Sequence, residues 1–142
     1  MHGLFFGIDE YKSPSCHNLS GAVQDVNNMV DYFHHDLGVP LEQLTVRLNS
    51  DATRSTIISD IQALANNPLI KKQDPIVIYF SGHGCTPKRP QNWPVIQAIV
   101  AHDSNTLDSN EKDIGVIPDY MINVLLGQLA SRCGNNIVRR VF

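Results

Sequence analysis

Two patterns of hydrophobic and polar positions alternate along this chain. Short, continuous apolar runs predict buried β-strands, and they lie at residues 4–8, 44–48, 76–80 and 98–101. Between them, apolar residues recur at spacings of three and four, which predicts amphipathic helices at residues 20–37, 53–66 and 118–133. A turn at residues 134–136 precedes an apolar pair that could begin one more strand, and residues 103–116 predict a polar, mobile loop.

The order of these elements predicts a single α/β domain. Strands that alternate with helices of this length are joined by right-handed crossovers, which build a mostly parallel sheet with helices on both faces. We therefore expect a three-layer sandwich. Thr53 is a suitable N-cap for the second helix, Gly38 suits the left-handed position that ends the first helix, and Gly134 is expected to end the third.

Length and composition narrow the class of protein. The chain has 142 residues, which fits one compact domain, and it is too apolar, at 42% hydrophobic and 18% charged residues, to be disordered. With 11 basic and 14 acidic residues its formal net charge is −3. It therefore lacks the concentrated basic face of a nucleic-acid or membrane-surface binder. No apolar run approaches the roughly 18 residues that a membrane-spanning helix needs.

Two features favour a cytoplasmic location. The N-terminus, Met1 to Gly3, lacks the basic segment that begins a cleaved signal peptide. The three cysteines, Cys16, Cys85 and Cys133, are an odd number with wide spacing. This pattern favours reduced thiols over a disulfide framework or a zinc ribbon.

The segment that follows the most apolar strand carries the strongest chemical signal. Ligands of open parallel sheets bind beyond the carboxyl ends of the strands, and Ser81-Gly82-His83-Gly84-Cys85 begins at that position. The glycines permit positive φ and close approach of a substrate. We interpret His83 as a general base and the Gly84 N–H as a donor to a developing oxyanion. The alternative is a tight turn with a surface histidine.

Several separate motifs resemble those of a known family. They are FGIDEY at residues 6–11, LSGAVQDV at 19–26 and the block from Asp74 through IVIYFSGHG at 76–84. In this order they resemble the caspase-like cysteine peptidases (peptidase family C14), most closely the metacaspases and fungal caspase-domain proteins. Residues 117–119 and 134–137 also look like the segment before the family's nucleophile strand. The likeness covers about the first half of a typical family domain.

The resemblance implies a peptidase that works through a Cys–His dyad and acts on polypeptides. In the family, the histidine of the Ser-Gly-His-Gly loop polarises a cysteine thiol and the next glycine contributes to the oxyanion hole, roles that map onto His83 and Gly84. A free thiol has a pKa of about 8.5, so it needs an adjacent imidazole to form thiolate at neutral pH.

The resemblance also assigns a role in substrate specificity to an acidic residue at the start of the first helix. The family places an S1-pocket acid there, and the matching residue is Asp25. A carboxylate pairs well with a guanidinium, so the resemblance implies cleavage after Lys or Arg. Without the resemblance, Asp25 would be interpreted as a first-turn acid that complements the helix dipole.

The C-terminal residues depart from the family pattern. The family's nucleophile segment resembles D-x-C-H-S-G or D-C-C-H-S-G, whereas this chain reads IVRRVF from Ile137 to Phe142. Arg139 and Arg140 also suit a doubly buried strand poorly, because an unpaired buried charge costs several kcal/mol. We therefore expect residues 1–142 to be a caspase-like domain truncated before the nucleophile loop, through a shortened or misread coding sequence. The extended frame would encode a cysteine a few residues further on.

Other thiols offer an alternative to this missing cysteine. Cys85 lies two residues from His83, and Cys16 follows the first strand at the same edge of the sheet. Each of them, like Cys133, can also be interpreted as an ordinary small side chain.

Metal sites are a further alternative. His83 and Cys85 could combine with His102 and Asp103, although they lack the paired spacing of zinc sites. The acidic residues Asp103, Asp108, Glu111 and Asp113 could attract calcium, on which some metacaspases depend, although no EF-hand spacing is present. We expect no metal or cofactor and leave calcium dependence open.

Two functions of different classes follow. The first is a caspase-like cysteine endopeptidase domain with a polypeptide substrate and no nucleic-acid or membrane partner. The second is a catalytically incompetent pseudo-peptidase that acts as an interaction module, because the nucleophile is missing from these residues. The oligomeric state stays open.

Overall fold

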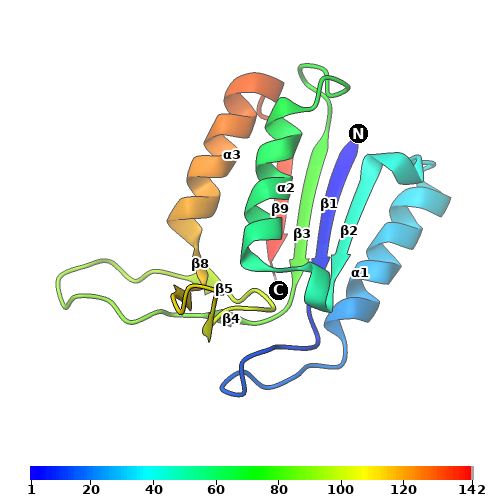
Figure 1. The fold of residues 1–142 in the computed structure, drawn as a ribbon. Helices are drawn as coiled ribbons and strands as arrows, with labels where there is room; N and C mark the ends of the chain where they lie inside the picture. The colour runs from blue at the N-terminus through cyan, green and yellow to red at the C-terminus, as the bar shows by residue number, and fades with distance from the viewer. Residues whose placement is uncertain (142) are drawn as a thin grey trace.

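The computed structural model describes residues 1–141. Over these residues the central sheet contains four parallel strands. The strands, in their spatial order, are β2 (Leu44–Leu48), β1 (His2–Gly7), β3 (Ile76–Ser81) and β9 (Ile137–Val141). Their carboxyl ends all point to the lower edge of the sheet in Figure 1.

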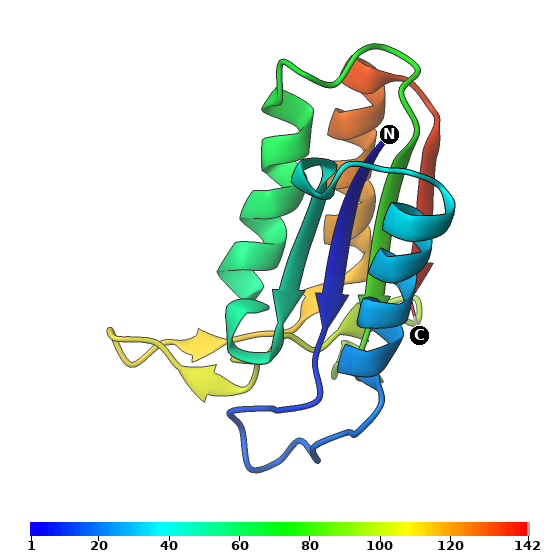
Figure 2. The same cartoon turned by 90° about the vertical axis from the view of Figure 1, so that its right-hand side faces the viewer.

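Helices cover both faces of this sheet. α1 (Ala22–Asp31) continues into a π-helical turn at Tyr32–Asp36 and lies on one face. α2 (Arg54–Asn66) and α3 (Asp119–Cys133) pack side by side on the other face (Figures 1 and 2). Two short 3-10 turns, Leu41–Gln43 and Asn49–Asp51, flank β2. The predicted three-layer α/β sandwich is confirmed.

Side chains of β1 alternate between two hydrophobic cores. Leu4 and Phe6 belong to the core formed with α2 and α3, whereas Phe5 packs against Phe33 and Tyr79 in the smaller core formed with α1. All five side chains are buried. Successive side chains of a strand point to opposite faces, so a strand between two helical layers needs the continuous apolar run that the sequence shows.

The chain connections diverge between β1 and β3. From β1 the chain crosses one face through α1 to reach β2, and from β3 it crosses the other face through α3 to reach β9. Such a divergence opens a crevice at the carboxyl edge of a parallel sheet. The segments after the two strands meet there, and the Ile8 N–H donates to the Ser81 carbonyl at 3.0 Å.

Two small antiparallel sheets lie beyond this edge. One contains β4 (Gly84–Cys85), β5 (Ala98–Ile99) and β8 (Ile117–Pro118), and the other contains β6 (Thr106–Leu107) and β7 (Asp113–Ile114). The strand predicted at 98–101 is therefore shorter and lies outside the parallel sheet, because an apolar run indicates burial and not the partner strand. The loop predicted at 103–116 contains the β6–β7 hairpin.

The predicted helix boundaries are mostly confirmed. The Thr53 side chain accepts a hydrogen bond from the Thr56 N–H at 3.2 Å at the start of α2. Gly38 and Gly134 have φ angles of +67° and +92°, a region that L side chains rarely adopt. The first helix differs, because regular α-helix ends at Asp31 and the π-helical turn fills the rest of the predicted range.

The last described strand lies at one edge of the sheet. Arg139 and Arg140 are exposed there, and Arg139 donates from Nη1 to the Asn123 side-chain oxygen at 3.1 Å. In the described sheet β9 has a neighbour on one side only, and both arginines reach solvent there. The expectation that arginines suit a doubly buried strand poorly therefore stays a prediction. Over residues 1–141, every helix is too short or too polar to cross a membrane.

Candidate active site

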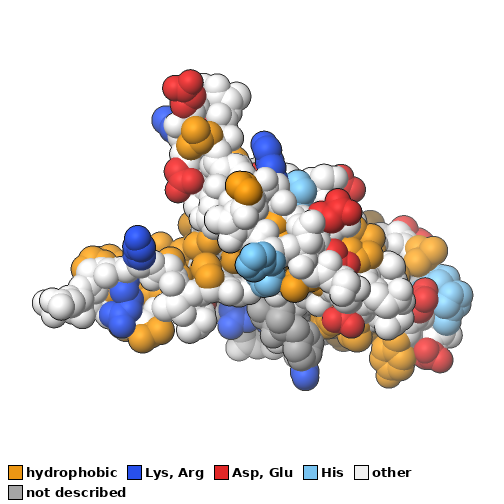
Figure 3. Space-filling view, turned by 90° about the horizontal axis from the view of Figure 1, so that it is seen from below, with side chains coloured by type: hydrophobic (Ala, Val, Ile, Leu, Met, Phe, Trp, Pro, Cys, Tyr) orange, Lys and Arg blue, Asp and Glu red, His pale blue; other side chains and the backbone are white. Residues whose placement is uncertain are grey.

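The candidate residues gather at the carboxyl edge, where the segments after β1 and β3 meet. Figure 3 looks onto this end of the molecule, with histidine side chains near the middle of the face. His83 follows β3 by two residues, and Asp25 lies in the first turn of α1. The parallel sheet therefore brings both predicted residues to one end of the molecule.

Three contacts hold His83 against the segment that follows β1. Its backbone N–H donates to the Tyr11 hydroxyl at 2.7 Å, and its Nε2 lies 2.7 Å from the His17 carbonyl oxygen. The Tyr11 and His83 rings also pack together, with centroids 5.0 Å apart. His83 is thus fixed by main chain, ring face and ring nitrogen, unlike a histidine on a simple surface turn.

The His17 contact determines which nitrogen of His83 can act as a base. A carbonyl oxygen only accepts hydrogen bonds, so Nε2 of the neutral ring carries the proton and donates it to His17. Nδ1 then keeps its lone pair, and the described residues supply it with no hydrogen-bond partner. The ring can therefore accept a proton at Nδ1 from a group placed beside it.

The two glycines that flank His83 differ in what they allow. A Cβ at residue 82 would lie 2.9 Å from the Tyr11 hydroxyl and 3.0 Å from the Phe80 ring, so a side chain there would displace one of these groups. A Cβ on Gly84 would meet only the Ala98 carbonyl, at 3.5 Å. Neither glycine is among the residues with positive φ. The expectation of positive φ is therefore wrong. At Gly82 the close approach is made by the Tyr11 hydroxyl, and close approach of a substrate stays a prediction.

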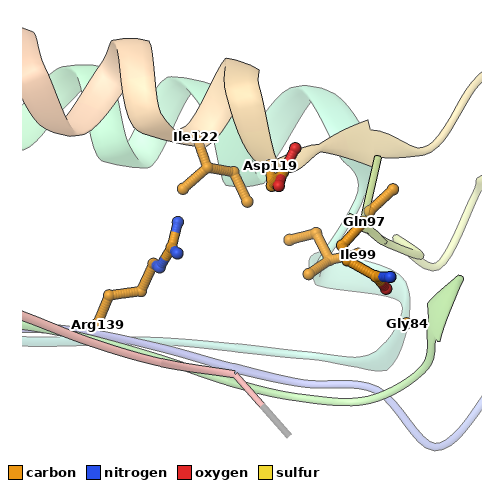
Figure 4. Close-up of a pocket in the computed structure, with 7 residues that line it drawn as sticks. Gly84, Gln97, Ile99, Asp119, Ile122 and Arg139 are labelled. Atoms are coloured by element: carbon orange, nitrogen blue, oxygen red, sulfur yellow. The ribbon is translucent and has the colours of Figure 1, made fainter. Parts of the chain in front are cut away.

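Gly84 borders a cavity of about 290 Å³. Ile99 of β5 and Ile122 of α3 form apolar walls, and Arg139 extends from β9 toward α3 (Figure 4). Asp119 lies at the start of α3 on the same cavity. The candidate oxyanion donor therefore adjoins open space between the small antiparallel sheet and β9.

Asp25 is linked to β3, the strand that precedes His83. Its carboxylate accepts a hydrogen bond from the Ser81 hydroxyl at 3.1 Å, and Ser81 is the last residue of β3. The Asp25 side chain is exposed, so a cationic group could reach it. Burial, and then the Asp25 charge, raise the pKa of Tyr79, which lies on the same strand.

A different acid caps α1. The two Asp9 carboxylate oxygens accept the N–H groups of Ala22 and Val23 at 2.8 and 3.2 Å. Asp9 thereby satisfies donors at the helix N-terminus that have no partner within the helix. The N-terminus of α1 is thus stabilised by Asp9, a residue that the sequence analysis did not single out. Asp25 can also be interpreted as an acid that complements the dipole of this helix.

The thiols beside the site lack the environment of an activated nucleophile. Burial raises the pKa of the Cys16 thiol and the nearby Cys85 raises it further, while burial also raises the pKa of Cys85. A nucleophilic cysteine needs a lowered pKa. Cys133 is only 2% exposed. Its carbonyl oxygen accepts a hydrogen bond from the Gln73 N–H, which lies before β3, at the end of the sheet opposite to the candidate site.

Side chains that the sequence suggested for a metal site form hydrogen bonds with backbone groups. His102 Nδ1 lies 2.7 Å from the Glu10 carbonyl oxygen, and Asp103 accepts the Arg54 N–H at the start of α2 at 2.7 Å. Asp108 accepts two backbone N–H groups of its own hairpin. Within residues 1–141, three or more His, Cys, Asp or Glu side chains do not gather in a way that could hold a metal ion.

Sequence reasoning missed the two residues that orient His83. Tyr11 falls within the FGIDEY motif, but no spacing links it to a residue 72 positions away. The His17 contact uses a backbone carbonyl, which every residue possesses. The available signal was topological, since adjacent parallel strands bring the segments after them together.

Comparisons with known proteins agree with this architecture. The family model described as the caspase domain (Peptidase_C14) matches residues 2–131. Among solved structures, the crystal structure of a Geobacter sulfurreducens protein, a structural-genomics target, is similar with a TM-score of 0.69 and 20% identity. The match covers 99% of this chain and 48% of that one, so this chain spans about half its length. At this identity the likeness concerns the fold alone. A search of curated proteins found no match.

The family match includes every residue predicted for the site. Asp25, His83 and Gly84 all lie inside the matched range, which ends before β9 begins. The match extends over well more than half of the chain, and the order of helices and strands around the site is continuous through it. This protein therefore belongs to the caspase-domain family.

Proposed function

We propose that this protein is the histidine-bearing part of a caspase-like cysteine peptidase of the metacaspase type, which cleaves polypeptides after Lys or Arg. The observation that carries the proposal is the 2.7 Å contact between His83 Nε2 and the His17 carbonyl. It favours the tautomer in which Nδ1 can take up a proton. Membership of the caspase-domain family supports cysteine-peptidase chemistry.

The proposed reaction begins with transfer of a thiol proton to His83 Nδ1. The thiolate attacks the peptide carbonyl, and the Gly84 N–H donates to the oxyanion that develops. The protonated imidazole then gives its proton to the leaving amine, and water hydrolyses the acyl-thioester that remains. The His17 carbonyl keeps the ring oriented and stabilises the imidazolium through the Nε2 hydrogen bond.

The proposed nucleophile lies outside the described residues. Cys16 and Cys85 have raised pKa values, which disfavour thiolate. β9 runs parallel to β3, so a residue that follows β9 would reach the edge at which His83 lies. We propose that the gene product contains a cysteine shortly after position 142, in a reduced, cytoplasmic protein.

Asp25 is the proposed S1 residue. Its exposed carboxylate lies at the carboxyl edge and bonds the Ser81 hydroxyl, two residues before His83. A guanidinium or ammonium group at the P1 position could form charge-assisted hydrogen bonds with the remaining acceptor sites of this carboxylate. The proposal makes no use of a metal ion.

A pseudo-peptidase that serves as an interaction module is the second candidate. A groove of about 500 Å³ lies on the α1 face of β3 and β9 and is lined by Met29, Phe33, Val77 and Val138, among others. Val138 is 61% exposed. An apolar groove beside an edge strand favours association with another surface.

Covalent labelling separates these two candidates. A peptidyl acyloxymethyl ketone with Arg at P1 is expected to label the extended gene product at a cysteine beyond residue 142, and His83→Ala should abolish that labelling. His35→Ala is the matched control, because His35 is exposed on the π-helical turn. An extended product that contains no cysteine there, or that is labelled equally without His83, would contradict the peptidase proposal.

The P1 preference has its own prediction. In the extended gene product, Asp25→Asn should lower kcat/KM for an Arg peptide about 100-fold, because a neutral amide loses the charge-assisted pair. Asp31→Asn, at the exposed end of the same helix, should leave the rate unchanged. Equal loss in both variants, or no loss in Asp25→Asn, would exclude Asp25 from the S1 pocket.

A further inference from the structure

We propose that Tyr11 is a positioning residue that holds His83 in the orientation needed for proton transfer. This inference deepens the proposed function and rests on it. It starts from a side chain that contacts His83 at two places, the main-chain N–H and the face of the ring. Tyr11 acts through His83 and need not touch the substrate.

The two contacts restrict different motions of His83. The hydrogen bond of 2.7 Å from the His83 N–H fixes the main chain just after β3. The ring contact, with centroids 5.0 Å apart and planes inclined by 44°, restricts rotation of the imidazole. With the chain and the ring plane both held, Nε2 is kept at the His17 carbonyl.

The Tyr11 hydroxyl stays neutral over the working pH range of a peptidase. Burial raises its pKa to about 12, and the nearby Cys16 and Asp9 act in the same direction, while the His83 N–H bond opposes them. A neutral hydroxyl oxygen can still accept the His83 N–H. The contact between the neutral hydroxyl and the His83 N–H is therefore present at neutral pH.

The hydroxyl also occupies the space below the His83 segment. A Cβ at Gly82 would lie 2.9 Å from the Tyr11 oxygen, closer than such atoms approach in ordinary packing. The absence of a side chain at residue 82 thus lets the Tyr11 hydroxyl reach the next N–H. Tyr11 and Gly82 form a matched pair from two segments far apart in the sequence.

One loop supplies both Tyr11 and the His17 carbonyl. The Tyr11 N–H donates to the Asn18 side-chain oxygen at 3.0 Å, and the Leu19 N–H donates to the Asp9 carbonyl at 2.8 Å. These bonds tie the two sides of the loop together. Movement of Tyr11 is consequently expected to displace the acceptor of His83 Nε2 as well as its main-chain anchor.

The test measures the protonated nitrogen of His83 in the 142-residue chain. ¹⁵N NMR of the imidazole distinguishes the Nε2–H and Nδ1–H tautomers in wild type, Tyr11→Phe and Tyr11→Leu. We expect the Nδ1–H fraction to rise about two-fold or more in Tyr11→Phe and further in Tyr11→Leu, because the first loses the hydroxyl and the second also loses the ring. Tyr120→Phe, at a side chain 54% exposed on α3, should match the wild type.

Folding and orientation are separated by the choice of variants. Amide spectra establish whether each variant is folded, and Tyr11→Phe, which keeps the ring, decides the question if Tyr11→Leu does not fold. A folded Tyr11→Phe with a wild-type tautomer ratio overturns the inference. Gly82→Ala, which pushes on the same hydroxyl, should shift the ratio in the same direction.

A kinetic arm separates this inference from the proposed function. In the extended gene product, Tyr11→Phe should lower kcat about 10- to 100-fold with KM changed less than about two-fold, because misplacing a catalytic group weakens the chemical step. A tautomer shift in an extended product that hydrolyses no peptide would support Tyr11 as a positioning residue and contradict the peptidase proposal. Equal loss in kcat and in substrate binding would contradict the positioning role.

Discussion

Asp9 shows how one side chain links the site to the fold. It caps α1 through two backbone N–H groups, and its own backbone N–H donates to the Asn49 side-chain oxygen at 2.9 Å. The helix that carries Asp25 is thereby tied to the segment that carries Tyr11. A change at Asp9 should therefore affect the start of α1 more than the sheet.

Asp9→Ala is expected to lower the free energy of unfolding by about 1–2 kcal/mol. The variant leaves the Ala22 and Val23 N–H groups without their side-chain acceptor, and loss of an N-cap typically costs this amount. Urea denaturation measures the change. Glu10→Ala, at the exposed neighbouring position, is the control and should differ from wild type by less than about 0.5 kcal/mol. Similar stability of the two variants would contradict the capping role.

For single residues, the sequence predicted where a side chain lies in the fold better than it predicted the groups that the side chain contacts. His83 could be placed because a glycine-flanked histidine directly follows a doubly buried strand. Its partners could not be predicted, because one is a backbone carbonyl and the other is a tyrosine hydroxyl from a distant loop. The roles of His83, Gly84 and Asp25 stay predictions.

The elements around the site depend on how their ends are formed. α3 ends at Gly134, where φ is +92° and a Cβ would lie 3.1 Å from the Gln73 side chain. The following turn begins β9, which pairs with β3 in parallel. The conformation of one glycine therefore directs the chain from the helical layer back into the sheet.

Two glycine substitutions in this element should have opposite effects. Gly134→Ala is expected to destabilise the protein by about 1–2 kcal/mol, because a side chain at this φ is strained. Gly127→Ala, on the exposed face of α3 with nothing near its added methyl group, should stabilise it by about 0.5–1 kcal/mol. Thermal unfolding compares the two variants. Effects of the same sign would contradict the assigned helix boundary.

Prediction of the elements succeeded where burial determines structure. The runs in β1 and β3 identify strands because both faces of the sheet are covered there, whereas β2, at the edge of the sheet, is mostly half-buried. The run at 98–101 is also buried, but its residues pair antiparallel with β4 and β8. Hydrophobic periodicity contains no information on the partner strand.

The whole molecule has a pH dependence that follows from the buried Tyr11 hydroxyl. Its pKa is about 12 in the folded protein and about 10 in an unfolded chain. The folded state therefore keeps the Tyr11 proton to higher pH than the unfolded chain does. The resulting contribution to the stability of the folded state is fully present below about pH 10 and is lost as the pH rises toward 12. Tyr79, whose pKa is also raised, acts in the same direction.

Urea midpoints measured from pH 9 to pH 12 check this dependence. Stability of the wild type should fall with rising pH above about pH 10, and the slope should be smaller in Tyr11→Phe, which has no proton to lose. Tyr120→Phe should keep the wild-type slope. An equal slope in wild type and Tyr11→Phe would contradict a buried, neutral hydroxyl beside His83.

The arrangement of the whole domain explains why His83, the proposed base, lies at this edge. Divergent connections at β1 and β3 open the crevice, a loop from β1 holds the imidazole, and α1 brings a carboxylate to the same strand end. The order of motifs along the sequence was enough to predict this layout. The orientation of His83 required the three-dimensional contact between two loops.

Hydrolysis of an Arg-containing peptide by the extended gene product tests the central claim most directly. Removal of the base should lower kcat/KM about 1,000-fold or more in His83→Ala, while the fold and the rate of His35→Ala remain those of the wild type. Hydrolysis by a folded His83→Ala protein at the wild-type rate would contradict the account, because proton transfer to His83 could not then be part of the reaction.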